Sequence, residues 1–282
     1  MTGALHEWIG RRRRVTDEMA APLVRRMAAL TDRTDIALER GAPVPGHWLC
    51  MLFDDAAPQA QLGPDGHPAR GDFLPPVPLP RRMLGGRRLT FHAAPRVGDV
   101  LERETEIAAI TPKVGRSGAI IFVMLRHTIT GPQGLVAVEE QDIAYLEARR
   151  NAPAPKDPPA EAPAAEWRVP FRPDPVMLFR YSALAFNGHR IHYDADYARD
   201  VEGYPALVVN GGVTTLFLLE AALDRQPGAR VLSYEARTFR PLFCGRAASL
   251  CAGAPDAEGR RLLWAEDETG ATALRMQAMI GP

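Results

Sequence analysis

The sequence of 282 residues predicts an α+β protein built from two similar halves, in each of which an antiparallel sheet wraps on a helix. Residues 151–166 are rich in proline and alanine and lack large apolar side chains, which is typical of an extended linker. They separate a first half, residues 1–150, from a second half, residues 167–282. In both halves a helical pattern precedes strand-like runs. This order, together with the absence of GxGxxG and P-loop motifs, argues against a doubly wound nucleotide-binding fold.

In the first half, apolar residues recur at helical spacing over residues 14–31, which predicts a helix there. The apolar positions are Val15, Met19, Leu23, Met27 and Leu30. Runs rich in β-branched and apolar residues follow it. The strands are predicted at 88–94, 100–110, 118–130 and 135–146.

The second half repeats this order. Leu178, Tyr181 and Leu184 stand at helical spacing before a polar loop, and Val213–Leu223 is its clearest helix. The strands are predicted at 230–240, 247–253, 260–266 and 271–280. A weak repeat supports two related halves, because Thr90–Gly98 resembles Thr238–Gly245, where a strand ends in Thr-Phe and the next begins after glycine.

Charge balance and cysteine usage narrow the class of partner. Lys and Arg total 34, as do Asp and Glu, so nucleic acid and anionic membranes are not expected and a small molecule is. The three cysteines are widely spaced, which favours neither a disulfide framework nor a zinc site and fits a reducing cytoplasm. The N-terminus lacks a signal-peptide pattern, and the apolar run Leu216–Leu223 is too short to span a bilayer. Arg11–Arg14 are interpreted as the solvated head of the first helix, with contact to substrate phosphates as the alternative.

The expected active site is the stretch Phe-Asn-Gly-His-Arg-Ile-His-Tyr-Asp at residues 186–194. Asn187, His189, Arg190 and His192 fall within six consecutive positions of a predicted loop, and such loops often carry catalytic side chains. His192 can exchange a proton near neutral pH, because an unperturbed imidazole has a pKa of about 6.5. No metal is expected, since His189 and His192 alone form only a weak H-x-x-H pair.

The chain resembles the MaoC-type, or type 2 hydroxyacyl-thioester dehydratase, group of double hot dog hydratases. The resemblance lies in residues 186–194, in Tyr-Ala-Arg-Asp-Val-Glu-Gly-Tyr-Pro at 197–205 and in Val-Val-Asn-Gly-Gly-Val at 208–213. Residues 81–87 and 139–142 resemble the non-catalytic first domain of mesaconyl-CoA and itaconyl-CoA hydratases. The resemblance implies a double hot dog fold, in which residues 1–150 shape the pocket and residues 167–282 carry the hydratase motif. It also implies reversible hydration of an enoyl thioester without a cofactor.

The signature of the broader family is Asp-x-Asn-Pro-x-His, and this chain departs from it. The aspartate position falls on Asn187, the asparagine on His189, the proline on Arg190 and the histidine on His192. An amide cannot accept and return a proton as a carboxylate can. His192 is therefore the expected general acid and base, and Asn187 is expected to hold the attacking water.

Backbone donors and cationic side chains complete the expected site. Gly211 and Gly212 stand at the start of the second-half helix after the N-cap Asn210, where free N–H groups favour the enolate oxygen of the thioester. The other expected substrate-binding residues are Arg190, His189, Arg82, Arg87 and Arg240. For Arg190 two roles stay open, a salt bridge to Asp194 or Asp196 and a bidentate pair with a substrate carboxylate. Arg240 is expected to bind the CoA moiety.

The function expected from the resemblance is hydration of a short branched dicarboxylic acyl-CoA, mesaconyl-CoA or itaconyl-CoA, to a citramalyl-CoA. One alternative is a 3-hydroxyacyl-thioester dehydratase of fatty acid or polyketide metabolism. A second alternative is a non-catalytic acyl-thioester-binding module. The replacement of the family aspartate by Asn187 favours this alternative. The chain is expected to act as a monomer or a homodimer in the cytoplasm.

Overall fold

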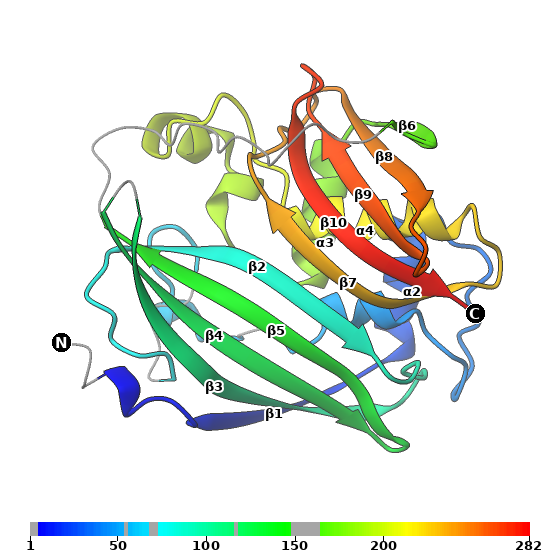
Figure 1. Ribbon diagram of the computed structural model, residues 1–282, viewed down its shortest axis with the longest axis horizontal. Helices are drawn as coiled ribbons and strands as arrows, with labels where there is room; N and C mark the ends of the chain where they lie inside the picture. The colour runs from blue at the N-terminus through cyan, green and yellow to red at the C-terminus, as the bar shows by residue number, and fades with distance from the viewer. Residues whose placement is uncertain (1–4, 54–55, 68–72, 116–117, 148–163) are drawn as a thin grey trace.

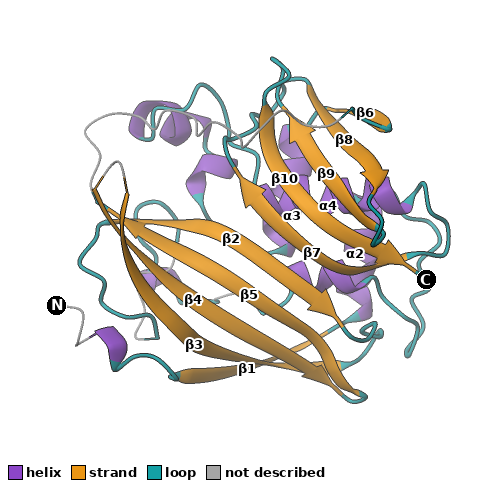
Figure 2. Cartoon of the chain, viewed as in Figure 1, coloured by secondary structure: helices purple, strands orange, loops and turns teal. Residues whose placement is uncertain are grey.

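The computed structural model describes residues 5–53, 56–67, 73–115, 118–147 and 164–282, and most of the predicted linker lies outside the described residues. Ten strands form one antiparallel sheet in the order β1-β3-β4-β5-β2-β7-β10-β9-β8-β6, with the helices behind it in the view of Figures 1 and 2. The strands are β1 (Arg12–Glu18), β2 (Arg81–Phe91), β3 (Val100–Gly115), β4 (Gly118–Gly131), β5 (Gly134–Leu146), β6 (Trp167–Phe171), β7 (Arg230–Thr238), β8 (Ala248–Pro255), β9 (Arg260–Glu266) and β10 (Thr272–Gly281). The α-helices are α2 (Ala21–Leu30), α3 (Pro175–Leu184) and α4 (Gly211–Leu223).

The sheet is continuous across the two halves, whereas the sequence predicted a separate sheet for each. β2 of the first half pairs antiparallel with β7 of the second half, from Arg87 opposite Ala236 to Thr90 opposite Ser233. Each of these strands would otherwise present a row of unpaired backbone groups, and joining the two edges satisfies those groups within one chain. The predicted runs at 88–94 and 230–240 overlap β2 and β7, but the strand patterns did not predict this seam.

The helix predicted over residues 14–31 is wrong in its first part, where the chain forms β1. Side-chain exposure alternates along this strand, and Arg12 and Arg14 form ion pairs with Glu104 of the neighbouring β3. The helix α2 begins only at Ala21, with Pro22 in its first turn, where proline is tolerated because that N–H has no helical partner. The arginines at 11–14 therefore do not head a helix.

The helix α4 is apolar around most of its circumference, because it is covered on all sides. It packs against β7, β8, β9 and β10 and against the 3-10 turn η1 (Gly46–Met51). The main partner of α2, in contrast, is α3. The sheet of the second half thus wraps on a central helix as predicted, while the first helix lies beside α3. Within the described residues, no helix is long and apolar enough to span a membrane.

A polar strip crosses the core-facing side of the first-half strands and separates two apolar clusters. Arg87 forms an ion pair with Glu139 at 2.6 Å, and the buried Thr105 hydroxyl lies 2.8 Å from Nδ1 of the buried His127. The cluster on one side includes Leu101 and Ile129, and that on the other includes Ile107 and Val123. The Arg87 side chain keeps 31% of its surface accessible, whereas its Nε and Oε1 of Glu139 are buried.

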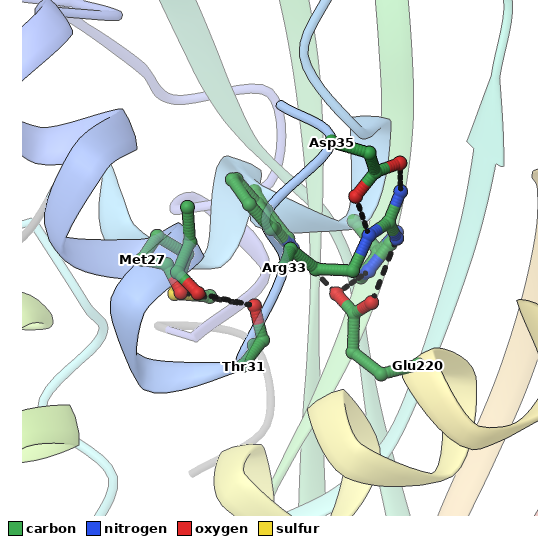
Figure 3. Close-up of polar contacts among 8 residues, drawn as sticks. Met27, Thr31, Arg33, Asp35 and Glu220 are labelled. Atoms are coloured by element: carbon green, nitrogen blue, oxygen red, sulfur yellow. Dashed lines mark hydrogen bonds and ion pairs between the residues drawn. The ribbon is translucent and has the colours of Figure 1, made fainter. Parts of the chain in front are cut away.

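Glu220, a buried carboxylate on α4, ties the two halves together (Figure 3). Its Oε1 accepts hydrogen bonds from Nε1 of Trp48 at 2.7 Å and lies 2.8 Å from Nε2 of His47, while Oε2 accepts from Arg33 at 3.0 Å. Arg33 is also held by Asp35, as Figure 3 shows. Burial opposes ionisation of Glu220, but these donors together hold its pKa below the ordinary value.

Replacing Glu220 with alanine is expected to reduce the free energy of unfolding by about 3 kcal/mol, since it leaves buried donors and a cation without their acceptor. Asp224, the exposed C-cap residue just after α4, provides the matched control. The measurement is urea-induced unfolding of Glu220→Ala and Asp224→Ala. Equal stability of the two variants would show that this cluster does not stabilise the fold.

Candidate active site

The loop that carries the predicted motif begins at a constrained helix end. α3 starts at the N-cap Asp174, whose side chain accepts a hydrogen bond from the backbone N–H of Met177. It ends at Leu184, and just beyond it Phe186 adopts the left-handed region at φ 44°, while the N–H of Asn187 donates to the carbonyl of Ser182 at 2.8 Å. Glycine usually occupies such a position, so phenylalanine there is strained. Strain of this kind persists where the surrounding structure fixes the backbone, which makes the start of the loop well defined.

Asn187 uses its side-chain oxygen within the loop. Oδ1 accepts a hydrogen bond from the backbone N–H of His189 at 3.0 Å, which is an Asx turn. The side-chain amide group remains as a donor toward a water molecule. Oδ1 of Asn187 thus fixes the turn, and within the described residues both hydrogens of the side-chain amide are left for a water molecule.

His192 lies at the end of the 3-10 turn η3 (Arg190–His192) and is buried. Its Nδ1 lies 2.7 Å from the carbonyl oxygen of Val208. A carbonyl can only accept, so Nδ1 must carry the proton and Nε2 must hold the lone pair in the neutral ring. Burial lowers the pKa of His192, and the bond to Val208 only partly opposes this. Within the described residues Nε2 makes no hydrogen bond, so His192 is a neutral base with a free nitrogen.

The segment that anchors His192 also begins α4. Val208 is three residues before Gly211, and three residues span at most about 11 Å, so the histidine and the helix N-terminus are close. The side chain of Asn210 caps the helix by accepting from the N–H of Gly212 at 2.7 Å. The N–H of Gly211 has no partner among the described residues, and this makes Gly211 the available donor of the pair.

A loop from the first half packs directly on the motif. A side chain at Gly66, which has φ +85°, would place its Cβ 2.0 Å from the carbonyl oxygen of Gly188, so only glycine allows this approach. The backbone N–H of Arg190 donates to the carbonyl of Asp65 at 2.9 Å. The ring of His67 lies 4.0 Å from that of His189 between centroids, and the ring of His189 meets that of His192 edge-on at 5.4 Å.

Asp65, His67 and His189 each offer a donor atom within 4.8 Å of the others, so they are the described residues most suited to a metal ion. The weak H-x-x-H pair of the sequence, His189 and His192, therefore has further potential ligands beside it, which come from a distant segment of the chain. The rings of His67 and His189 are tilted by only 35° and lie nearly face to face. Imidazoles that share an ion direct their nitrogens at one point, and Nδ1 of His67 already lies 3.2 Å from Asp65. This geometry fits stacking and hydrogen bonding better than metal binding.

Comparison with known proteins identifies the family of the chain. A family model described as hydroxyacyl-thioester dehydratase type 2 matches residues 46–244. The chain belongs to this family. As a member of this family, the protein is a hydro-lyase of the hydratase or dehydratase type. The match confirms the family resemblance that the sequence showed in residues 186–213.

Among relatives of this dehydratase-family chain, a protein of Chloroflexus aurantiacus named mesaconyl-C(4)-CoA hydratase is 41% identical over 277 residues, 97% of each chain. A mitochondrial hydroxyacyl-thioester dehydratase type 2 of Schizosaccharomyces pombe is 28% identical and covers 73% of this chain and 76% of its own length.

The solved structures confirm the double hot dog fold. A Mycobacterium tuberculosis protein described as having a double hot dog fold superposes with a TM-score of 0.61 at 17% identity, covering 97% of this chain and 96% of its own. A MaoC-like dehydratase from Phytophthora capsici gives 0.67 at 17% identity, covering 96% of this chain and 95% of its own.

In this dehydratase-family member, the guanidinium of Arg190 is engaged by neighbouring groups of the protein. Its Nε and Nη2 donate to Asp194 at 3.0 and 2.8 Å, and Nη1 donates to the carbonyl of Pro64 at 3.0 Å. The guanidinium also lies 4.1 Å from the ring centre of Tyr197. Of the two roles left open by the sequence, the geometry supports the salt bridge to Asp194.

The other three arginines predicted to bind substrate differ in how they are engaged. Arg87 pairs with Glu139, and Arg240 lies 3.5 Å from Asp267. Arg82 is exposed at the start of β2 and makes no ion pair within the described ranges. It stands opposite the buried Tyr145 of β5 on the core-facing side of the sheet. Arg82 is thus the one of these arginines that is available for an anionic substrate group.

Proposed function

We propose that this member of the family adds water to the α,β-double bond of a short branched dicarboxylic acyl-CoA, with mesaconyl-CoA or itaconyl-CoA giving a citramalyl-CoA. The name of the relative that is 41% identical over 97% of both chains supports this substrate class. The observation that carries the chemistry is the buried His192, with Nδ1 bonded to Val208 beside the start of α4.

The proposed reaction uses a single titrating group. Nε2 of His192 takes a proton from water as the water oxygen adds to the β-carbon, and the electron pair moves to the thioester oxygen. The imidazolium then returns the proton to the α-carbon, so that no net charge or cofactor is needed. The side-chain amide of Asn187 would hold the water, because its oxygen is already committed to the loop.

The proposed enolate site is the first turn of α4. The N–H of Gly211 points its dipole at the developing oxyanion, together with the positive end of the helix. Gly212 supports this donor indirectly, because its own N–H is bonded to Asn210. The predicted pair of donors thus becomes one donor and one residue that keeps the helix start in place.

We propose Arg82 as the group that binds the free carboxylate of the acyl chain. The first half reaches the motif through its loop at residues 63–67, where Gly66 lies against Gly188 and the carbonyl of Asp65 accepts a hydrogen bond from the backbone N–H of Arg190. Residues 1–150 would therefore form one wall of the pocket and residues 167–282 the catalytic wall.

The test is loss of the absorbance of the conjugated thioester across a panel of enoyl-CoA substrates. Turnover is expected on mesaconyl-CoA or itaconyl-CoA, and Arg82→Met is expected to raise KM for these roughly tenfold, the cost of a lost charge-assisted pair. The KM for crotonyl-CoA, which has no second carboxylate, should stay the same. Arg25→Met, at an exposed position of α2, is the control. Equal effects of Arg82→Met on both substrates would rule out carboxylate recognition by Arg82.

A second candidate substrate class is the longer, uncharged 3-hydroxyacyl thioester. The family description and the Schizosaccharomyces pombe relative favour it. Activity on crotonyl and longer thioesters, with none on dicarboxylic ones, would select this class over the first.

A further inference from the structure

The loop at residues 63–67 of the first half places a carboxylate and an imidazole next to the catalytic loop. Nδ1 of His67 lies 3.2 Å from Oδ2 of Asp65, and Oδ1 of Asp65 accepts the backbone N–H of His67 at 3.1 Å. These contacts fix the orientation of the His67 ring. The ring then stacks on His189, whose edge meets His192, so the four side chains form one continuous row.

The loop is held rigidly enough for such a role. Within it, Gly63 and His67 are joined by a backbone hydrogen bond of 2.8 Å. Outside it, Arg190 bonds to the carbonyls of both Pro64 and Asp65, and Gly66 lies against Gly188. Backbone contacts on both sides of the row therefore set the position of His67 relative to the motif.

We propose that Asp65 and His67 are positioning residues for the hydration reaction, which act through His189 to hold the ring of His192. This inference rests on the proposed function. It assigns a role in turnover to residues of the first half, which the sequence had predicted to be non-catalytic.

The charged groups around His192 leave Asp65 as the carboxylate that orients the row. On the segment of His192 itself, Asp194 is paired with Arg190. On the following π-helical turn η4 (Tyr197–Val201), the Tyr197 hydroxyl donates to Glu202. Asp65 forms no ion pair with an arginine among the described residues, and its carboxylate lies against His67, with His189 and Tyr197 close enough to feel its charge.

His67 and Asp65 change the pKa of His189 in opposite directions, and this difference can be measured. The pKa of His189 is lowered to about 4, mainly by burial and in addition by His67 and His192, while Asp65 acts to raise it. His67 also acts to lower the pKa of His192. Removing His67 should therefore raise both pKa values, and neutralising Asp65 should lower that of His189. A role limited to loop folding would not produce shifts of opposite sign.

The test combines kinetics with side-chain NMR titration. His67→Ala and Asp65→Asn are expected to lower kcat roughly 10- to 100-fold, as a misplaced catalytic group does, while KM changes by less than about threefold. His67→Phe keeps a flat ring against His189 and should recover part of kcat. His92→Ala, at an exposed histidine of the first half, is the control and should match the parent.

The NMR titration of the seven histidines needs no substrate, so it stands even if the parent hydrates no thioester in the panel and the proposed function fails. Shifts in the stated directions would support the row. Unchanged pKa values of His189 and His192, together with kcat equal to that of His92→Ala, would overturn it. Loss of parent activity with EDTA and its recovery with Zn²⁺ would also overturn it, in favour of a metal site at Asp65, His67 and His189.

Discussion

Replacing His192 with alanine is expected to lower kcat for thioester hydration by roughly 10²- to 10⁴-fold, the usual contribution of a general acid or base. The reason is the fixed tautomer: Nδ1 is bonded to Val208, so Nε2 is the nitrogen that can take the proton of water. The side-chain oxygen of Asn187 is committed to its own turn. An amide does not titrate, so Asn187 cannot replace the lost base.

The fold is expected to survive this change, which removes one hydrogen bond from an irregular segment. Far-UV circular dichroism and urea unfolding check that point, and His92→Ala is the matched histidine control. If purified His192→Ala hydrates every thioester that the parent accepts at close to the parental rate, the assignment of His192 as the catalytic base is wrong.

The second large effect is expected at Gly212, where alanine should reduce turnover roughly 10²-fold, the loss found when one oxyanion donor is removed. A Cβ at this position would lie 2.0 Å from Oη of the buried Tyr181 and 3.0 Å from Oδ1 of Asn210. The helix start must shift to relieve this overlap, and the N–H of Gly211 moves with it. Overpacking of this kind also costs about 1–3 kcal/mol of stability.

Gly211 provides an internal control, because it is the adjacent residue of the same helix turn. A Cβ there meets only Oγ1 of Thr238 at 3.8 Å, an ordinary contact, and alanine keeps the backbone N–H. Gly211→Ala should therefore retain most of kcat. The measurements are kcat and thermal stability of Gly211→Ala and Gly212→Ala. If both variants lose equal activity and stability, the lack of space beside Tyr181 is not the reason for glycine at position 212.

Most of the fold could be predicted because its strands carry a strong local pattern. The run predicted at 118–130 is β4, and that predicted at 260–266 is β9 within the same bounds. β1 could not be recognised, because its charged side chains are accommodated in a strand only by their partner residues on β3, which are distant in the sequence. The seam between β2 and β7 is likewise a contact between distant segments, and no local pattern records it.

The candidate site likewise contains residues that a local pattern predicted and residues that only distant contacts bring together. The motif itself indicated His192 and Asn187, and the glycine pair before Val213 indicated the helix N-terminus. Asp65 and His67 were missed because they lie more than a hundred residues before the motif. Their only local signal is Gly-Pro-Asp-Gly-His, which predicts a turn but not what the turn contacts. Sequence alone also could not decide whether Arg190 pairs with a substrate carboxylate or with Asp194.

The dependence of kcat/KM on pH for mesaconyl-CoA hydration tests the central claim, that a single neutral histidine serves as the base. Burial holds the pKa of His192 below its ordinary value of 6.5. The active form is the neutral ring, so activity should be constant from neutral pH down past 6.5 and fall only as the pH drops through this lower pKa. One ionisation with a midpoint below 6.5, absent from the residual activity of His192→Ala, is the expected result. A midpoint above pH 7, or the same profile in His192→Ala, would contradict it.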